Sequence, residues 1–324
     1  YRTSGAFIIE DDPDGNPWGA NVHRMFNMSD DSGLFVDIQD IDWTEYDRDG
    51  QVLHPQSSDQ DTLIGLYESK LTHQFNHRFA TFGEIPDDAV DSGDAYEFAP
   101  SELDDKTNLT SQRYWIPYSE YENKSGRDWH IALRDITNAT NRRTAIFSIL
   151  PETATGHSLN HVSGPSARDA LLLVAAFNSY TQDFVARQKV GGTHLSHFIT
   201  RQLPIPHPNR FKQLLYDGSP IADRIRDLTI KLTYNATDLQ EFAAEAGFDR
   251  DPYSYTKPDG YLREDIRFEL EALIAHVYGI EADDFERLFA TFEQIKTEDI
   301  NEHGHYRTRD EIKQRFEDMK QEIT

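Results

Sequence analysis

One apolar segment, ALLLVAAF at residues 170–177, restricts the fold more than any other feature of the chain. It follows Ser166-Ala-Arg-Asp169, a capping-box pattern whose polar side chains bind the free N–H groups at the start of a helix. The helix predicted from this pattern runs on to Gln188 and is stopped by Gly191-Gly192. The apolar run is less than half as long as a membrane-spanning helix needs. We therefore expect a packed helix in a globular protein.

The rest of the chain divides into a strand-rich part and a helical part. Strands are predicted within 62–75, over 113–118, 129–137 and 143–151, and over 197–206, where proline residues end the last one. The acidic stretch 84–113 is predicted to be a loop. Helices are predicted over 210–246, 260–278, 281–293 and 307–322, with connecting segments at 247–260 and 297–306.

The expected fold class is therefore α+β. We predict a mixed, β-rich domain with a packed helix over residues 1–208, followed by a mostly α-helical domain over residues 209–324. The chain begins at Tyr1 without a methionine, which we interpret as the start of a fragment of a longer protein. No membrane-spanning helix or signal peptide is expected, and we predict a cytoplasmic protein.

The charge balance of the chain determines which sequence signal can indicate a nucleic-acid partner. The formal net charge is -25, Asp outnumbers Glu by 35 to 22, and only 10 of the 32 basic residues are Lys. Dispersed acid with little lysine is typical of halophilic proteins, in which an acidic surface maintains solubility in strong salt. Net charge therefore does not exclude nucleic acid as a partner, and segments free of acid are the better signal.

Three stretches are poor in acid and rich in side chains that bind DNA. No Asp or Glu occurs from Phe184 to Tyr216, and the stretches KLTHQFNHR (70–78) and RDITNATNRRT (134–144) are basic and amide-rich. Arg, Lys, Asn and Gln hydrogen-bond phosphates and base edges, and phosphates approach only where carboxylates are absent. Each stretch also has a plain structural interpretation, such as a helix cap at Gly191-Gly192.

Common catalytic motifs are missing from the chain. There is no G-x-G-x-x-G, P-loop, G-x-S-x-G or H-E-x-x-H motif, and the absence of Cys excludes disulfides and cysteine-ligated metal. One weak nuclease pattern remains, because Asp61 and Glu68-x-Lys70 flank an apolar run as a Mg²⁺-binding carboxylate pair with a lysine would. We predict no catalytic residue, metal site or cofactor in this chain, and keep the nuclease as an alternative.

Six segments resemble the C-terminal half of large adenine-specific DNA methyltransferases. This group includes type IIG fused restriction–methylation enzymes and the methyltransferases of BREX and DISARM phage-defence islands. The resemblance covers about residues 16 to 310. The segments are WGANVHRMFNMSDDSGLF (18–35), LYESKLTHQFNHRFATF (66–82), YWIPYSEY (114–121), LRDITNATNRRTAIFSILP (133–151), ARQKVGGTHLSHFITRQLPIP (186–206) and LREDIRFELEALIAHVYGI (262–280).

The resemblance implies a target-recognition region without its catalytic domain. Such enzymes carry an Asn/Asp-Pro-Pro-Tyr motif and a glycine loop for S-adenosylmethionine, and this chain has neither. Its expected partners are double-stranded DNA, the catalytic methyltransferase domain of the same parent chain and other defence-system proteins. The catalytic domain would extract the target adenine from the stack while this region reads the site.

The resemblance also supplies candidates for DNA contact. Lys189 and the turn Gly191-Gly192-Thr193 are the candidates for phosphate, where glycine lets backbone N–H groups approach closely. Gln74, Asn141 and Arg142 are weaker candidates for base edges. The remaining candidates are Lys70, Arg78, Arg134, Arg143, Arg187, His194 and Arg201.

A second alternative is a docking module, in which the C-terminal helices bind a partner of a defence complex. An exposed apolar stripe on the final helices would favour docking, whereas a basic concave face over residues 187–212 would favour DNA.

Overall fold

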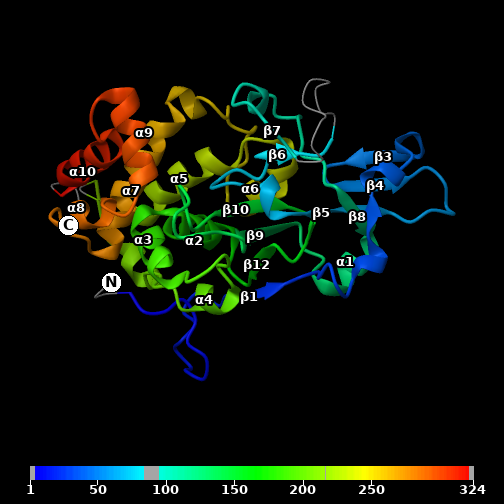
Figure 1. The fold of residues 1–324 in the computed structure, drawn as a ribbon, viewed down its shortest axis with the longest axis horizontal. Coiled ribbons are helices and arrows are strands. Elements are labelled where there is room, and N and C mark those ends of the chain that lie inside the picture. Colours follow the sequence, from blue (N-terminus) through cyan, green and yellow to red (C-terminus); the bar gives the residue numbers. More distant parts are fainter. Residues whose placement is uncertain (1–3, 84–94, 216, 321–324) are drawn as a thin grey trace.

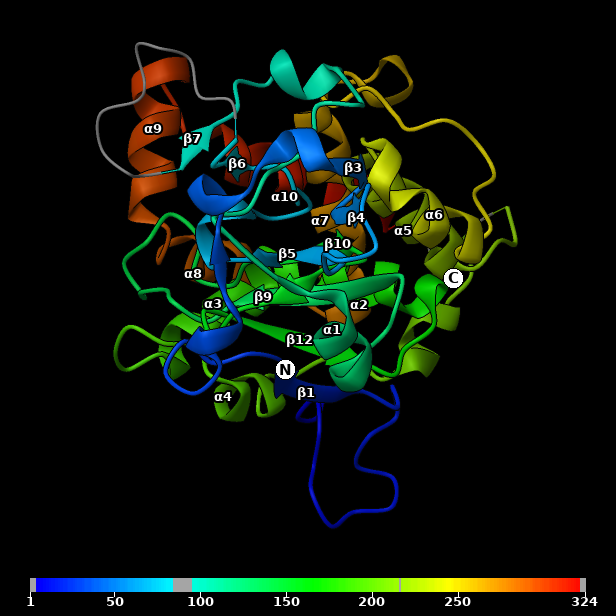
Figure 2. The same cartoon turned by 90° about the vertical axis from the view of Figure 1, so that its right-hand side faces the viewer.

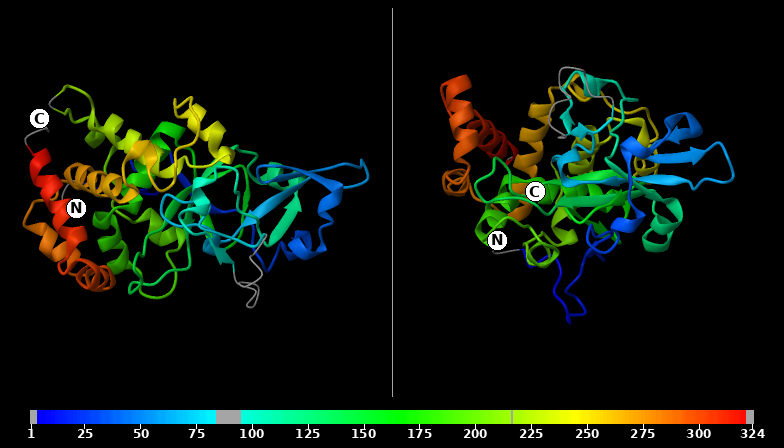
Figure 3. Two further views of the ribbon diagram at one scale, coloured as in Figure 1. Left: turned by 90° about the horizontal axis from the view of Figure 1, so that it is seen from above. Right: turned by 45° about the vertical axis from the view of Figure 1, so that its right-hand side comes forward.

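The computed structural model describes residues 4–83, 95–215 and 217–320. A four-stranded sheet lies in the middle of the molecule, with further strands at one end and the last helices at the other (Figure 1). The view from above shows the same order, with the C-terminal helices and the second group of strands at opposite ends (Figure 3). The predicted α+β class is confirmed.

The central sheet is antiparallel throughout, in the order β1-β12-β9-β10. Its strands are β1 (Asn21–Arg24), β12 (Leu159–Ser163), β9 (Trp129–Arg134) and β10 (Phe147–Pro151). Ile131 and Ile149 lie opposite each other and belong to the main hydrophobic core. Successive strand side chains alternate between faces, so Ala132 and Leu150 join a separate cluster on the other face. Two of the predicted strands are thus confirmed in shortened form.

A second sheet lies beside the first, in the order β2-β8-β5-β4-β3, with β11 pairing to β5 in the parallel direction. Its strands are β2 (Val36–Asp37), β3 (Tyr46–Asp49), β4 (Val52–Pro55), β5 (Leu63–Tyr67), β8 (Tyr114–Pro117) and β11 (Ala154–Thr155). A short pair, β6 (Ala80–Thr81) with β7 (Tyr96–Glu97), and the helix α1 (Tyr118–Lys124) complete this part. Of the loop predicted over 84–113, residues 84–94 lie outside the described residues.

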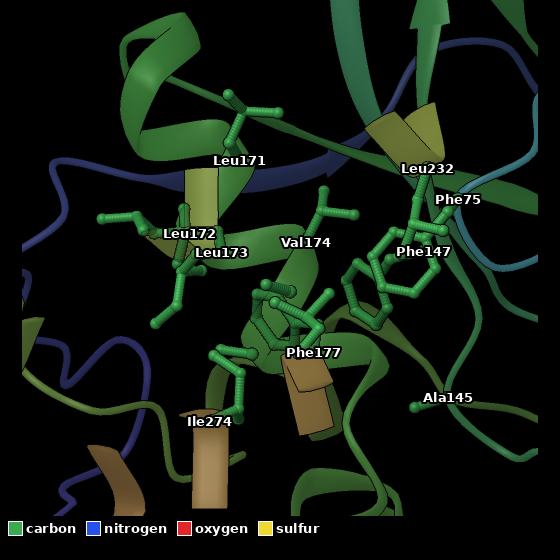
Figure 4. Packing of buried hydrophobic residues seen from close by; sticks show 14 of the residues in the cluster. Phe75, Ala145, Phe147, Leu171, Leu172, Leu173, Val174, Phe177, Leu232 and Ile274 are labelled. Atoms are coloured by element: carbon green, nitrogen blue, oxygen red, sulfur yellow. The ribbon is translucent and has the colours of Figure 1, made fainter. Parts of the chain in front are cut away.

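Helix α2 (Ala167–Asn178) begins where the capping pattern predicts. The hydroxyl oxygen of Ser166 accepts a hydrogen bond from the Asp169 N–H at 3.2 Å. Phe177 of α2 stacks on Phe147 of β10, with ring centroids 4.1 Å apart, inside the main core (Figure 4). This contact fixes the apolar helix on one face of the central sheet.

The predicted helix is in fact two helices. The chain is extended at Ser179, where ψ is 152°, and α3 (Tyr180–Lys189) begins immediately afterwards. Ser179 causes the break, because its hydroxyl oxygen accepts the Gln182 N–H at 3.1 Å and so caps a new helix. Gly191-Gly192 does not form a left-handed cap: α3 ends before extended Val190, and neither glycine has a positive φ.

The strand predicted over 197–206 is wrong in its first half. Residues His197–Arg201 form a short helix, α4, and its N-cap Ser196 accepts the Ile199 N–H. After a turn at residues 202 and 203, Pro204 forms an antiparallel bridge with Ala6, and Ile205 N donates to Gly5 O at 3.1 Å. The serine cap outweighs the β-forming content of this segment. Figure 2 shows α4 beside β1, at the edge of the central sheet.

The C-terminal part is helical, as predicted, but is divided differently. Its helices are α5 (Ile221–Thr233), α6 (Gln240–Glu245), α7 (Arg263–Tyr278), α8 (Asp284–Phe289), α9 (Glu293–His303) and α10 (Arg307–Met319). The helix predicted over 210–246 is interrupted by loops. Helix α9 occupies much of the predicted connection at 297–306, because a surface helix that buries little more than Ile295 can have a polar sequence. Residues 321 and 322 lie outside the described residues.

One hydrophobic core crosses the predicted boundary at residue 208. It extends from Phe7 near the N-terminus to Phe316 in α10, and α2 packs against both α5 and α7. No gap between two hydrophobic cores therefore marks the predicted boundary. That the two parts are separate domains, each folding independently, stays a prediction.

Shortening Phe177 tests whether both parts unfold together. Phe177→Ala is expected to lower the free energy of unfolding by about 3–5 kcal/mol, because it removes a fully buried ring. The exposed-site control Ile300→Ala should change it by less than about 0.5 kcal/mol. All four Trp residues lie before residue 130, so tryptophan fluorescence reports the β-rich part and circular dichroism mainly the helices. Coincident urea transitions are expected, and two separate transitions would contradict a shared core.

Candidate nucleic-acid interface

The loop from residue 135 to residue 146, between β9 and β10, is the centre of the candidate interface. Arg187 of α3 holds its backbone by donating hydrogen bonds to Ala139 O at 2.7 Å, Asn141 O at 2.6 Å and Arg142 O at 2.9 Å. Within the loop, the Thr144 hydroxyl donates to Asn138 O at 3.0 Å. The loop is therefore held in one conformation, although its tip is exposed.

The segment after α3 pairs with this loop along one side. Thr137 N donates to Thr193 O at 3.0 Å, and Leu195 N donates to Asp135 O at 2.7 Å. The imidazole of His194 lies 3.0 Å from the Asp135 carboxylate, which is buried. The acid-free stretch 184–216 thus lies directly beside the stretch 134–144.

The stretch 70–78 meets the base of the same loop from the other direction. Arg134 donates to Ser69 O at 2.8 Å and to Thr72 O at 2.9 Å. Gln74 Nε2 donates to Ala145 O at 2.7 Å. Two stretches that are far apart in the sequence, 70–78 and 184–216, therefore converge on the loop that the third stretch, 134–144, forms.

The candidates for DNA contact differ sharply in exposure. Exposed residues are Asn141, Arg142, Lys189, Gly191, Gly192, Thr193 and His194. Half-buried residues are Lys70, Arg134 and Arg201, and buried residues are Gln74, Arg78, Arg143 and Arg187. The exposed group therefore comes from only two of the three stretches.

The buried candidates serve the interior, which corrects their assignment to DNA. Arg78 donates to the backbone oxygens of Leu103, Asp105, Asn108 and Asn235. Arg143 has no exposed side-chain surface and lies 2.6 Å from the Asp183 carboxylate. Gln74 and Arg187 are held by loop carbonyl groups. An arginine or amide that satisfies buried oxygens in this way has no surface to offer to a duplex.

The half-buried candidates have internal partners as well. The Lys70 ammonium lies 4.7 Å from the centre of the Phe82 ring. Arg201 forms an ion pair with Glu10 and donates to Val22 O at 3.1 Å. These cations contribute to the local charge, but their geometry is set by the protein.

Local charge around the loop is positive despite the net charge of the chain. Burial, together with the nearby positive charges of Arg134, Arg267, Arg143 and Arg142, lowers the pKa of the His73 imidazole to about 3. Opposing acid is present: Arg142 Nε lies 2.7 Å from Glu298 in α9. His73 thus reports four arginines close to one point.

The sequence did not point to Arg267 of α7, one of these four arginines, or to Arg263 one turn before it, which lies beside Arg142 and Arg267. Both lie on the helix face that also carries Glu271, at successive intervals of four residues. The recurrence of charged residues at intervals of four along this helix is the signal that could have found them.

The nuclease alternative loses its geometric basis. Asp61 precedes β5 and Glu68 follows it, so the five-residue strand separates them by about 16 Å or more. One Mg²⁺ requires carboxylate oxygens within about 2.1 Å of the ion. These two carboxylates therefore cannot share one metal ion.

The docking alternative lacks its predicted surface. Ile312 and Phe316 of α10 are buried, and α10 packs against α7. Among the described residues of α8–α10, Ile300 is the one large aliphatic or aromatic residue with an exposed side chain. A single side chain does not form an apolar stripe.

Two buried histidines, His130 and His161, and the half-buried His23 lie on the face of the central sheet away from α2. The ring centroids of His23 and His161 are 3.6 Å apart, and those of His130 and His161 are 5.4 Å apart. Burial lowers the pKa of His161 to about 2 and that of His130 to about 3, so both rings are neutral. Over residues 4–83, 95–215 and 217–320, no group of His, Asp or Glu has an arrangement that could hold a metal ion.

No family model matches the chain, and neither does any curated protein. Across the described ranges, no helix has both the length and the apolar content that crossing a membrane requires.

The buried histidines predict a loss of stability in acid. Their pKa values in the folded state lie below the unfolded value of about 6.5, so the unfolded chain binds more protons below that pH. The contribution of these histidines to the free energy of unfolding should be fully present above about pH 6.5. It should fall as the pH drops toward 3, by about 2 kcal/mol per histidine at pH 5. Urea unfolding at pH 7.5 and pH 5, at constant salt, measures this difference.

His161→Leu should reduce that pH dependence, because leucine cannot bind a proton. His54→Leu, at an exposed histidine, is the matched control and should leave it unchanged. An equal loss of stability at pH 5 in His161→Leu and wild type would contradict the assignment of the effect to the buried ring.

Proposed function

We propose that this chain binds double-stranded DNA as the recognition region of an adenine-specific DNA methyltransferase or a related restriction–modification or phage-defence enzyme. The observation that supports the proposal is the convergence of two acid-poor stretches, 70–78 and 184–216, on the loop 135–146, which the third such stretch forms. That convergence leaves Asn141, Arg142, Lys189 and Thr193 exposed on adjoining segments.

Each exposed group has a distinct role in this proposal. Lys189 and the backbone of Gly191-Gly192-Thr193 bind phosphates, since a Cβ atom at either glycine would meet no protein atom within 4 Å and the space in front is open. Asn141 and Arg142, at the exposed loop tip, reach base edges. Phosphate contacts position the duplex, and the loop tip reads it.

The chemistry lies with the proposed partner domain. A catalytic domain in the same parent chain binds S-adenosylmethionine and receives the extruded adenine, while this region holds the duplex from the other side. We place this assembly in the cytoplasm, with other defence-system proteins as further partners.

Binding to a random-sequence duplex should weaken as salt increases. The logarithm of the binding constant falls linearly with the logarithm of salt concentration, by about 0.9 per phosphate neutralised. Arg142→Ala combined with Lys189→Ala is expected to reduce the slope by roughly 2. Fluorescence anisotropy across a potassium chloride series, within the range where circular dichroism shows a folded protein, measures the slope.

The matched control removes one exposed arginine and one exposed lysine elsewhere, as Arg250→Ala with Lys320→Ala. It should retain the wild-type slope. An equal reduction in both double variants would show a response to overall charge, and no binding by the folded wild type would end the proposal.

A further inference from the structure

A cavity of about 270 Å³ opens beside the candidate interface, between α7, the start of α3 and α10. Its charged lining includes Arg142, Arg263 and Arg267, and aromatic rings of Tyr180, Tyr255 and Phe268 form other parts of the wall. Arg142 also belongs to the exposed loop tip, so the cavity adjoins the proposed DNA surface.

The carboxylates of the lining, Glu264 and Glu271, do not neutralise the three arginines, although Arg142 also pairs with Glu298 outside the lining at 2.7 Å. Glu264 is paired with Arg307 at 2.6 Å, on the side of α10. Burial raises the pKa of Glu271 to about 7, so this carboxyl group carries only part of a negative charge at neutral pH. Positive charge therefore exceeds negative charge in the lining.

Arg267 shows most clearly that a neutralising carboxylate is missing. Its guanidinium donates a hydrogen bond to Gln74 Oε1 at 3.1 Å, and among the described residues no carboxylate oxygen lies within 4.0 Å of it. Burial and the charges of Arg143 and Arg142 lower its pKa, so the protein makes its charged form costly. By contrast, Arg263 donates to two carbonyl oxygens, those of Phe75 and Leu232.

A partly buried charge that has only neutral hydrogen-bond partners is costly, so a cavity lined by such charges favours a bound anion. Guanidinium groups match the paired oxygens of phosphate, and they bind it more strongly than they bind neutral acceptors. We propose that this cavity binds a phosphate group through Arg267, Arg142 and Arg263. The phosphate belongs either to the DNA backbone or to a free phosphate or nucleotide. The cavity alone carries this inference, which holds whether or not the chain binds a duplex.

Thermal unfolding in inorganic phosphate tests the site. At pH 7.5 and constant ionic strength, the unfolding temperature of the full chain should rise with phosphate relative to chloride and then saturate. Arg267→Gln is expected to weaken phosphate binding by about tenfold or more, since it removes a charged donor. Arg224→Gln is the control, because Arg224 is an exposed arginine already paired with Glu269 at 2.5 Å.

Equal phosphate-dependent shifts in wild type, Arg267→Gln and Arg224→Gln would overturn the site, as would no shift in wild type. If Arg267→Gln fails to fold, Arg142→Gln serves instead, because Arg142 is at the exposed rim. Its expected result is a several-fold weaker phosphate affinity by isothermal titration, and an unchanged affinity would overturn the site.

A competition experiment identifies the source of the phosphate. Duplex affinity that falls as phosphate saturates the site, at constant ionic strength, assigns the cavity to the DNA backbone. Unchanged duplex affinity assigns it to a free phosphate or nucleotide. Lys189→Ala separates this inference from the proposed function, because it should weaken duplex binding and leave phosphate binding intact.

Discussion

The buried guanidinium of Arg78 is the interaction on which the arrangement of the two parts depends. It is completely inaccessible to solvent and donates to carbonyl oxygens at Leu103, Asp105 and Asn108 on one side and at Asn235 on the other. Neighbouring pairs reinforce the junction: Asn76 with Tyr255, and His77 with Asp238. A buried charge tolerates little displacement of its partners, so the helical part has one position relative to the sheets.

The same construction determines the candidate interface. The Asp183 carboxylate lies 2.6 Å from Arg143 and 3.6 Å from Arg187, and Arg187 in turn holds the loop whose tip carries Arg142. The buried arginines Arg143 and Arg187 thus position the exposed Arg142. A binding surface supported in this way needs little reordering on association, which lowers the entropic cost of binding.

Sequence patterns over a few residues predicted the features that depend on interactions between near neighbours in the chain. The Ser166 cap, the core helix behind it and the strands β9 and β10 could be predicted because capping and apolar periodicity act over a few residues. The break at Ser179 and helix α4 were missed, since a serine cap competes with the surrounding propensities. Whether each arginine is buried or exposed could not be predicted from the sequence. The carbonyl groups that bind Arg78, for example, lie more than twenty residues away along the chain.

Amide hydrogen exchange of the full chain, with and without a random-sequence duplex, tests the location of the interface most directly. Bound DNA should slow exchange in the segments 138–142 and 189–194, which carry the exposed candidates, and leave α6 unchanged. Protection of α6 or of the outer face of α10, with none in those two segments, would contradict the proposed surface.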